Sequence, residues 1–124
     1  MKIEVRSGQH GVIYDEPPRP SNNAYLIGGT ILHPGGCRAP HPRSPRALLV
    51  PIGAPWLKLA EAIDYLRFAR PVVAIPIHHQ GLAAANHMLH SALLQRLAPP
   101  GTTVLRLEHG QPTALPDLGR PSEH

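Results

Sequence analysis

Histidine and cysteine side chains stand at three places where the chain enters or leaves an expected strand. They are His10, the loop at residues 33–37, which contains Cys37, and the adjacent pair His78 and His79. Histidine and cysteine are the natural ligands of zinc. Sites assembled from separate strand ends are typical of metallohydrolases, in which a metal-bound water becomes the nucleophile at neutral pH. A second interpretation is that one histidine of the pair caps its strand and the other is solvated, and spacing alone favours it.

The sequence contains none of the motifs that identify a complete catalytic centre. It has no H-x-H-x-D-H, H-E-x-x-H or C-x-x-C ligand pair, and no G-x-S-x-G, P-loop or G-x-G-x-x-G motif. The histidines outside the three positions do not fill this gap, since His87 and His90 fall on the polar side of an expected helix and His124 lies in a tail. Spacing alone therefore does not establish a metal site.

The composition is that of one domain with a modest core, because 42% of the 124 residues are hydrophobic and only 4% are aromatic. The arginines behind the formal charge of +4 are scattered singly, so nucleic acid is not a favoured partner. A single cysteine can form no internal disulfide and fits a reducing cytoplasm, where we expect the protein. No apolar run is long enough for a membrane span, and the first residues lack a signal-peptide core.

A strand, a helix and a second strand in the middle of the chain would position the histidine pair. Residues 47–52 and 71–77 are short apolar runs that predict buried strands. Residues 56–68 predict a helix between them, and its apolar face is expected to hold Leu59, Ile63 and Leu66. Such a unit has parallel strands and a right-handed crossover. The histidine pair then falls at the carboxyl end of the second strand, where open α/β sheets usually place their ligands.

Further elements are expected on both sides of this unit. Two short strands at residues 3–6 and 10–14 come first, followed by a hairpin at residues 24–33, whose paired glycines Gly28 and Gly29 suit a tight primed turn. A helix at residues 82–97 and a strand at residues 102–107 follow the histidine pair. The apolar stripe of that helix is expected to hold Leu82, Ala85, Leu89, Ala92, Leu93 and Leu97.

The order of these segments resembles the carboxyl-terminal half of a metallo-β-lactamase-fold hydrolase, of the UlaG-like branch. In that family a strand-borne histidine is followed by a hairpin ending in a Gly-Asp pair, a strand reading L-L-P-[IV]-G/A, a helix, and a strand ending P-[IM]-H. The counterparts here are Gly8-Gln9-His10, Leu32-His33-Pro34-Gly35-Gly36, Leu48-Leu49-Val50-Pro51-Ile52-Gly53, Glu61-Ala62-Ile63-Asp64-Tyr65-Leu66-Arg67 and Ile75-Pro76-Ile77-His78. The similarity keeps its order over residues 3–112.

The resemblance implies half of an αββα sandwich, with a mixed sheet and two main helices at residues 1–112 and a flexible tail at residues 113–124. It places His10 and His78 at metal-ligand positions, with His79 as a neighbour and residues 54–57 at the mouth of the site. The bridging aspartate of the family falls at Gly36, which has no side chain and cannot bind a metal. Cys37, one residue further on, could supply a thiolate in its place.

The resemblance also implies that most of the metal ligands are missing, because the H-x-H-x-D-H motif belongs to the amino-terminal half of the family's fold. A catalytic zinc normally has three protein ligands, so we expect weak zinc binding or none in this chain alone. One half of the sandwich would expose the inner face of its sheet, and a second copy or a complementary chain is expected to cover it.

Three functions are compatible with the sequence. The first is a truncated, catalytically degenerate half-domain, which is a pseudoenzyme or an assembly partner. The second is a working metal-dependent hydrolase completed by another chain. The third is an α/β binding module unrelated to metals, whose basic surface binds an anionic partner.

Overall fold

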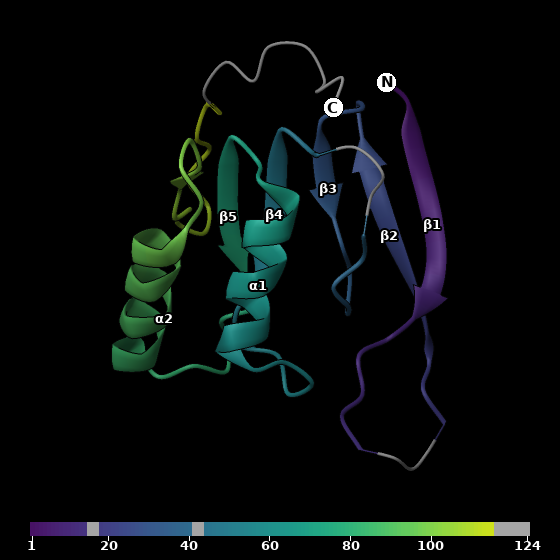
Figure 1. Cartoon of the computed structure of the whole chain (residues 1–124), viewed down its shortest axis with the longest axis horizontal. Coiled ribbons are helices and arrows are strands. Elements are labelled where there is room, and N and C mark those ends of the chain that lie inside the picture. Colours follow the sequence, from purple (N-terminus) through teal and green to yellow (C-terminus); the bar gives the residue numbers. More distant parts are fainter. Residues whose placement is uncertain (15–17, 41–43, 116–124) are drawn as a thin grey trace.

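The computed structural model describes residues 1–14, 18–40 and 44–115. Over these residues the chain forms one mixed sheet of six strands and two α-helices (Figure 1). The elements are β1 (Ile3–Gln9), β2 (Ser21–Ile27), β3 (Ile31–His33), β4 (Ala47–Pro51), α1 (Leu59–Ala69), β5 (Val73–Ile77), α2 (Ala84–Leu97) and β6 (Thr103–Val104). The strands lie in the sheet in the same order as in the sequence. The prediction of an α/β fold with a mixed sheet and two main helices is confirmed.

The turn between β2 and β3 is the tight hairpin that the paired glycines predict. Gly28 and Gly29 have φ angles of +61° and +70°, in the left-handed region that glycine adopts without steric cost. Two successive residues with positive φ are the requirement of a type I′ turn, whose twist matches that of the flanking strands. The turn fixes the register, in which Ile27 lies opposite Ile31.

Most of the strands end at the same edge of the sheet. Strands β3, β4, β5 and β6 are parallel, and β1 runs in the same direction because both β1 and β3 are antiparallel to β2. The arrows of β1, β3, β4 and β5 accordingly point to the lower edge of the sheet in Figure 1. The segments that follow these strands carry the candidate metal ligands, so the topology brings those segments to one edge.

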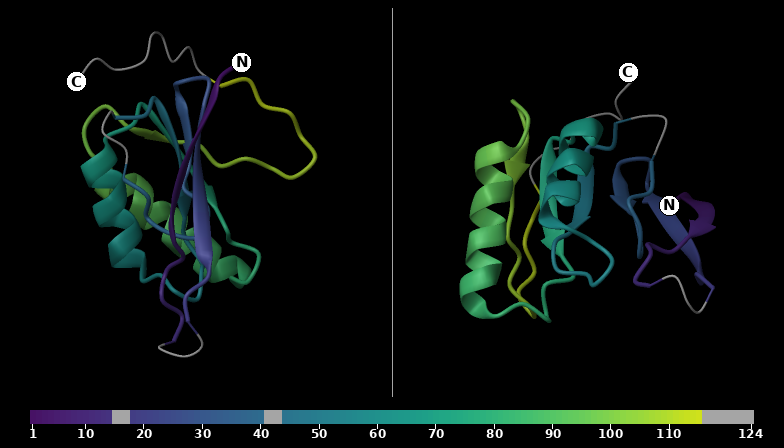
Figure 2. Two further views of the ribbon diagram at one scale, coloured as in Figure 1. Left: turned by 90° about the vertical axis from the view of Figure 1, so that its right-hand side faces the viewer. Right: turned by 60° about the horizontal axis from the view of Figure 1, so that its bottom comes forward.

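Both helices pack on one face of the sheet, where the main core lies (Figure 2). The core joins side chains of β2, β3, β4 and β5 to the inner faces of α1 and α2. Its most buried members include Leu32, Leu48, Val50, Leu66 and Leu94. In the described residues no helix is both long enough and apolar enough to cross a membrane.

The opposite face of the sheet is covered only in part. Residues 105–115 form a loop that projects from this face near β5 (Figure 2). Leu105 and Leu115 pack against a cluster that includes Val73. Leu115 belongs to the segment expected to be a tail, and residues 116–124 lie outside the described part of the chain. Near β1 and β2 the same face is open, and Val5 is 54% exposed.

The strand expected at residues 10–14 is absent, and that prediction was wrong. The first strand instead continues to Gln9, and the chain then turns across the ends of β2 and β3. Two backbone hydrogen bonds hold this course, from the His10 N–H to the Pro20 carbonyl at 3.0 Å and from the Gly11 N–H to the Gly36 carbonyl at 2.8 Å. The strand expected at residues 102–107 is also shorter, since β6 spans only Thr103–Val104.

Helix α2 buries a different face from the one its leucines predict. Leu94 and Ser91 are buried, whereas Leu89, which belongs to the predicted stripe, is 54% exposed. One reason is a polar contact, because the Nδ1 atom of His90 lies 2.9 Å from the Ile52 carbonyl oxygen and turns that side of the helix toward the sheet. His90 is therefore half-buried, and its placement on the solvated side was wrong. Helix α1 buries Ala62, Tyr65, Leu66 and Ala69, of which only Leu66 was predicted.

Leu94→Ala should destabilise the fold by about 2–5 kcal/mol, because it removes a side chain with no exposed area from the centre of the core. Leu89→Ala is the matched control on the same helix, and it should change the free energy of unfolding by less than about 0.5 kcal/mol. Urea titrations followed by circular dichroism measure both values. An equal loss in the two variants would contradict the burial of Leu94 in preference to Leu89.

Candidate functional site

His10, Gly36 and Trp56 meet at the carboxyl edge of the sheet. The imidazole of His10 occupies the space into which a side chain at position 36 would point. The imidazole also packs edge-on against Trp56, with ring centroids 5.9 Å apart and an angle of 76° between the ring planes. Gly11 packs against the indole, and a Cβ atom at position 11 would overlap the ring. Position 36 can therefore hold no larger side chain while the His10 imidazole stays in place.

The hydrogen bond of His10 fixes which ring nitrogen carries its proton. Nδ1 lies 2.9 Å from the carbonyl oxygen of Gly11, and a carbonyl can only accept, so the proton of the neutral ring is on Nδ1. Nε2, which lies over Gly36, then carries the lone pair of the neutral ring. A histidine that donates one ring N–H to a carbonyl and offers the other nitrogen has the arrangement common among metal-ligating histidines.

The side chain of Asn22 holds the loop that contains Gly36 and Cys37. Asn22 is 9% exposed, its Oδ1 accepts from the Gly36 N–H at 2.6 Å, and its Nδ2 donates to the Pro34 carbonyl at 3.0 Å. Nδ2 also lies 3.1 Å from the sulfur of Cys37. Gly35 lies directly over this amide with φ +72°, and a Cβ there would come within 2.5 Å of Asn22 Oδ1. The loop therefore depends on one buried amide and on the glycine at position 35.

The surroundings of Cys37 favour its neutral thiol form. Burial raises the pKa of its thiol, although the guanidinium groups of Arg19 and Arg38 act in the opposite direction. The thiol lies 3.7 Å from the Pro34 carbonyl, to which it can donate. The raised pKa favours the thiol over the thiolate, and the thiol is the weaker nucleophile of the two.

His78 lies at the end of β5 in an unusual backbone conformation. Its φ angle is +59°, which costs a residue with a Cβ atom free energy that glycine would not incur. The side chain is exposed, while the backbone is crowded, since a Cβ added at Gly53 would lie 2.7 Å from the His78 carbonyl oxygen. The exposed imidazole is free to reach a ligand that approaches from outside the domain.

The two predicted metal ligands are not joined by a third. Among the residues that the structure describes, no three His, Cys, Asp or Glu side chains come together in a group that could hold a metal ion. His10 has glycine and tryptophan beside it, and His78 stands at the exit of β5. The described residues therefore do not fit a catalytic zinc, which needs three protein ligands.

His79 forms a stack of histidines that the sequence did not predict. Its ring lies 4.1 Å from that of His87 at 12° and 5.7 Å from that of His109 at 28°. His87 was placed on the solvated face of its helix, and the structure corrects this, because it is half-buried against His79. Burial lowers the pKa of His79, and repulsion from His87, His109 and Arg106 lowers it further. Parallel rings cannot direct their nitrogens at one metal ion, and the described residues show no metal-binding group here.

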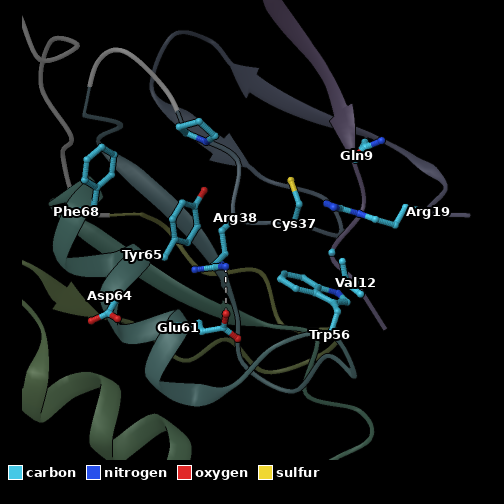
Figure 3. Close-up of a pocket in the computed structure, with 12 residues that line it drawn as sticks. Gln9, Val12, Arg19, Cys37, Arg38, Trp56, Glu61, Asp64, Tyr65 and Phe68 are labelled. Carbon is cyan, nitrogen blue, oxygen red and sulfur yellow. Dashed lines mark ion pairs between the residues drawn. The ribbon is translucent and has the colours of Figure 1, made fainter. Parts of the chain in front are cut away.

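A cavity of about 620 Å³ opens beside His10, between α1 and the loops that follow β1 and β3 (Figure 3). Trp56 lines it, and of residues 54–57, which the resemblance places at the mouth of the site, it is the one in the lining. Tyr65 lines it from α1 and donates a 2.7 Å hydrogen bond to the Ala39 carbonyl, and burial raises the pKa of its phenol. The sequence did not predict this cavity, because its walls come from segments far apart in the chain.

The comparisons with known proteins concern the fold more than the site. No protein-family model matches the sequence. Over 83 residues, or 63% of its length, the chain is 36% identical to Protein Rv0786c of Mycobacterium tuberculosis, and the match spans 39% of that protein. Among solved structures the chain is similar to Igni18, described as a novel metallo hydrolase from the hyperthermophilic archaeon Ignicoccus hospitalis. The TM-score is 0.53 at 17% identity, over 84% of this chain and 50% of that chain.

The structural likeness defines the class of fold. The mixed sheet and two helices correspond to half of a metallo-hydrolase-like sandwich. At 17% identity the likeness extends to the fold alone. The half-sandwich expected from the sequence is confirmed at this level.

Asn22→Ala should lower the free energy of unfolding by about 1–3 kcal/mol, because it leaves the Gly36 N–H and the Pro34 carbonyl without their partner. The neighbouring Asn23→Ala removes an exposed amide with a single hydrogen bond, to Ser7, and should cost less than about 0.5 kcal/mol. Urea unfolding measures both. Equal effects would mean that the loop is held by something other than Asn22.

The histidine stack should make stability depend on pH. The folded-state pKa of His79 lies below its ordinary 6.5, so below that pH the unfolded chain takes up a proton that the folded chain resists. Stability should therefore be full above the ordinary pKa and fall as the pH drops toward the lowered folded-state value. His79→Phe keeps an aromatic ring without a titrating group, and it should lose less stability between about pH 8 and about pH 5. Identical losses in the urea midpoints of the two proteins would contradict this origin.

Proposed function

We propose that this chain is the carboxyl-terminal half of a metallo-β-lactamase-like hydrolase fold, of the UlaG-like branch, and has no catalytic metal centre of its own. The observation that carries the proposal is the uncovered apolar face of the sheet at β1 and β2. In an αββα sandwich the corresponding face packs against a second sheet. The likeness to half of a metallo hydrolase supports the same assignment.

The uncovered face carries apolar side chains from both β1 and β2. Ile3 lies opposite Ile27, and Val5 lies opposite Tyr25, so these four side chains share one face of the β1–β2 pair. Ile3, Val5 and Tyr25 are 52%, 54% and 39% exposed. Apolar side chains gathered on a flat sheet favour association, because pairing removes them from water. The partner is a second copy of this chain or a complementary chain that brings its own sheet.

The ligand positions support the absence of catalysis in the isolated chain. Gly36 stands where the family has its bridging aspartate, and the His10 ring fills the space that a carboxylate there would need. Restoring the aspartate would force His10 to another rotamer. The zinc that the resemblance implies is therefore expected to bind this chain weakly or not at all.

A working hydrolase completed by another chain is the second candidate function. It is favoured by the free lone pair of His10 Nε2 and by the exposed position of His78. A partner that carried the H-x-H-x-D-H ligands could add them to these two histidines. The two functions share the sheet face as an interface and differ in whether a metal centre forms across it.

The isolated chain should self-associate, and Val5→Lys should raise its dissociation constant about tenfold or more, because a charge would lie inside the apolar interface. Phe68→Lys is the control, since Phe68 is 73% exposed on α1, on the other side of the sheet. Light scattering over a range of concentrations gives the mass, and metal analysis of the same samples gives the zinc content. We expect less than one retained zinc per chain, unchanged by His10→Ala or His78→Ala.

Two results would reject the proposal. One is a monomer at every concentration, with Val5→Lys indistinguishable from wild type. The other is one tightly held zinc per isolated chain that the two histidine variants remove, which would make the chain a metal-binding unit in its own right.

A further inference from the structure

The cavity beside Trp56 continues into a second hollow along the β1–β2 hairpin. The second hollow has a volume of about 480 Å³ and shares part of its lining with the first. The shared residues are Gln9, Cys37, Arg38 and Pro40. Together the two form one groove, called here the α1 groove, which lies on the helix side of the sheet, away from the uncovered apolar face. It is built wholly from this chain, so it needs neither a metal ion nor a second subunit.

Each of the two hollows of the α1 groove contains an arginine side chain. Arg6 lines the second hollow and Arg19 lines the first cavity, and neither makes an ion pair with any carboxylate in the described part of the chain. The Nε–H of Arg19 donates to the His10 carbonyl at 3.0 Å, which holds the side chain in place. Its guanidinium group points toward Cys37 in Figure 3. A guanidinium group that is not paired with a carboxylate makes the part of the first cavity beside Arg19 suited to an anion.

Arg38 also lines the groove, but it forms an ion pair with a carboxylate. Its Nη2 atom lies 3.1 Å from Oε2 of Glu61, which reaches into the groove from α1. The other oxygen of that carboxylate accepts the backbone N–H of Lys58 at 2.8 Å, so Glu61 is anchored at the start of the helix. Glu61 thus neutralises Arg38, and Glu61 and Asp64, a second carboxylate that lines the first cavity, both repel an anion bound there. The ion pair of Arg38 and Glu61 therefore makes the affinity of the groove for an anion lower than it would be without the carboxylate.

Aromatic side chains form the remaining walls of the first cavity. Trp56 lies below Cys37 and Arg19, and Tyr65 lies across the cavity from it (Figure 3). The hydroxyl group of Tyr65 is bonded to the Ala39 carbonyl and the residue is 6% exposed, so only a small part of its ring borders the cavity. Flat apolar surfaces on two sides of an open cavity favour a flat apolar guest.

We propose that the α1 groove binds a small anionic ligand that carries an aromatic ring, with its anionic group beside Arg19 and its ring between Trp56 and Tyr65. A phosphate and a carboxylate share the chemistry that the arginines recognise. The ring distinguishes the ligand from an inorganic ion. The binding site lies beside the predicted metal-ligand position His10, but it uses different atoms.

Titration with phenyl phosphate and with benzoate tests the proposal, and the fluorescence of Trp56 reports binding, because Trp56 is the chain's only tryptophan. At least one of the two should give a saturable change. Inorganic phosphate and phenol, which carry the two halves separately, should each bind at least about tenfold more weakly. Raising the salt concentration should weaken the binding.

Substitutions that weaken and that strengthen ligand binding test where the anionic group lies. Arg19→Ala should weaken binding about tenfold or more, because a hydrogen bond between charged groups is lost. Glu61→Gln should strengthen it about threefold, since it removes the competing charge and keeps an oxygen for the Lys58 N–H. Arg96→Ala, an exposed change on α2 outside the groove, should leave affinity within about twofold of wild type.

Three outcomes would overturn the proposal. They are the absence of a saturable response to both aromatic anions, an equal affinity for inorganic phosphate, and a loss in Arg96→Ala as large as that in Arg19→Ala. If Arg19→Ala fails to fold, Glu61→Gln decides alone, because a decrease or no change in affinity would contradict the assigned position of the anion. None of these results depends on the association or zinc content of the chain.

Discussion

The buried amide of Asn22 is the interaction on which the carboxyl edge of the sheet depends. Strand β3 is only three residues long, so sheet hydrogen bonds cannot position the loop that follows it. The amide does this by binding the backbone at Pro34 and Gly36. Gly36 in turn accepts a hydrogen bond from Gly11, and Gly11 lies against Trp56. The orientation of His10 and one wall of the α1 groove both follow from this chain of contacts.

The sequence predicts those elements whose cause is local. The hairpin at Gly28 and Gly29 and the parallel unit of β4, α1 and β5 follow from turn chemistry and from short apolar runs, and the structure confirms both. The face of α2 could not be predicted in this way. The predicted face is based on the spacing of the leucines. The helix is instead oriented by the contact of His90 with the Ile52 carbonyl and by the stacking of His87 on His79. Tertiary polar contacts of this kind leave no periodic signal.

The sequence predicts the position of His78 better than that of His10. His78 follows β5 at the carboxyl edge, as expected, whereas His10 was expected to open a strand and instead follows β1. The sequence could not indicate that His10 would occupy the space above Gly36, since the strand predicted at residues 10–14 placed it elsewhere. The sequence also could not predict the α1 groove, because Arg19, Cys37 and Tyr65 come from three separate segments of the chain.

Strand β1 has no buried residue, and this gives the sheet an uneven resistance to local opening. Its hydrogen bonds to β2 are protected by little side-chain packing, whereas β4 and β5 pack against the helices on one face and against Leu105 and Leu115 on the other. Native-state hydrogen exchange at β1 is then governed by fraying of the edge, and exchange at β4 by unfolding of the whole domain. Because His10 follows β1 directly, the imidazole is attached to the part of the sheet that opens most easily. Any partner that adds to the β1 edge would therefore also slow the motion of His10 and of the groove wall next to it.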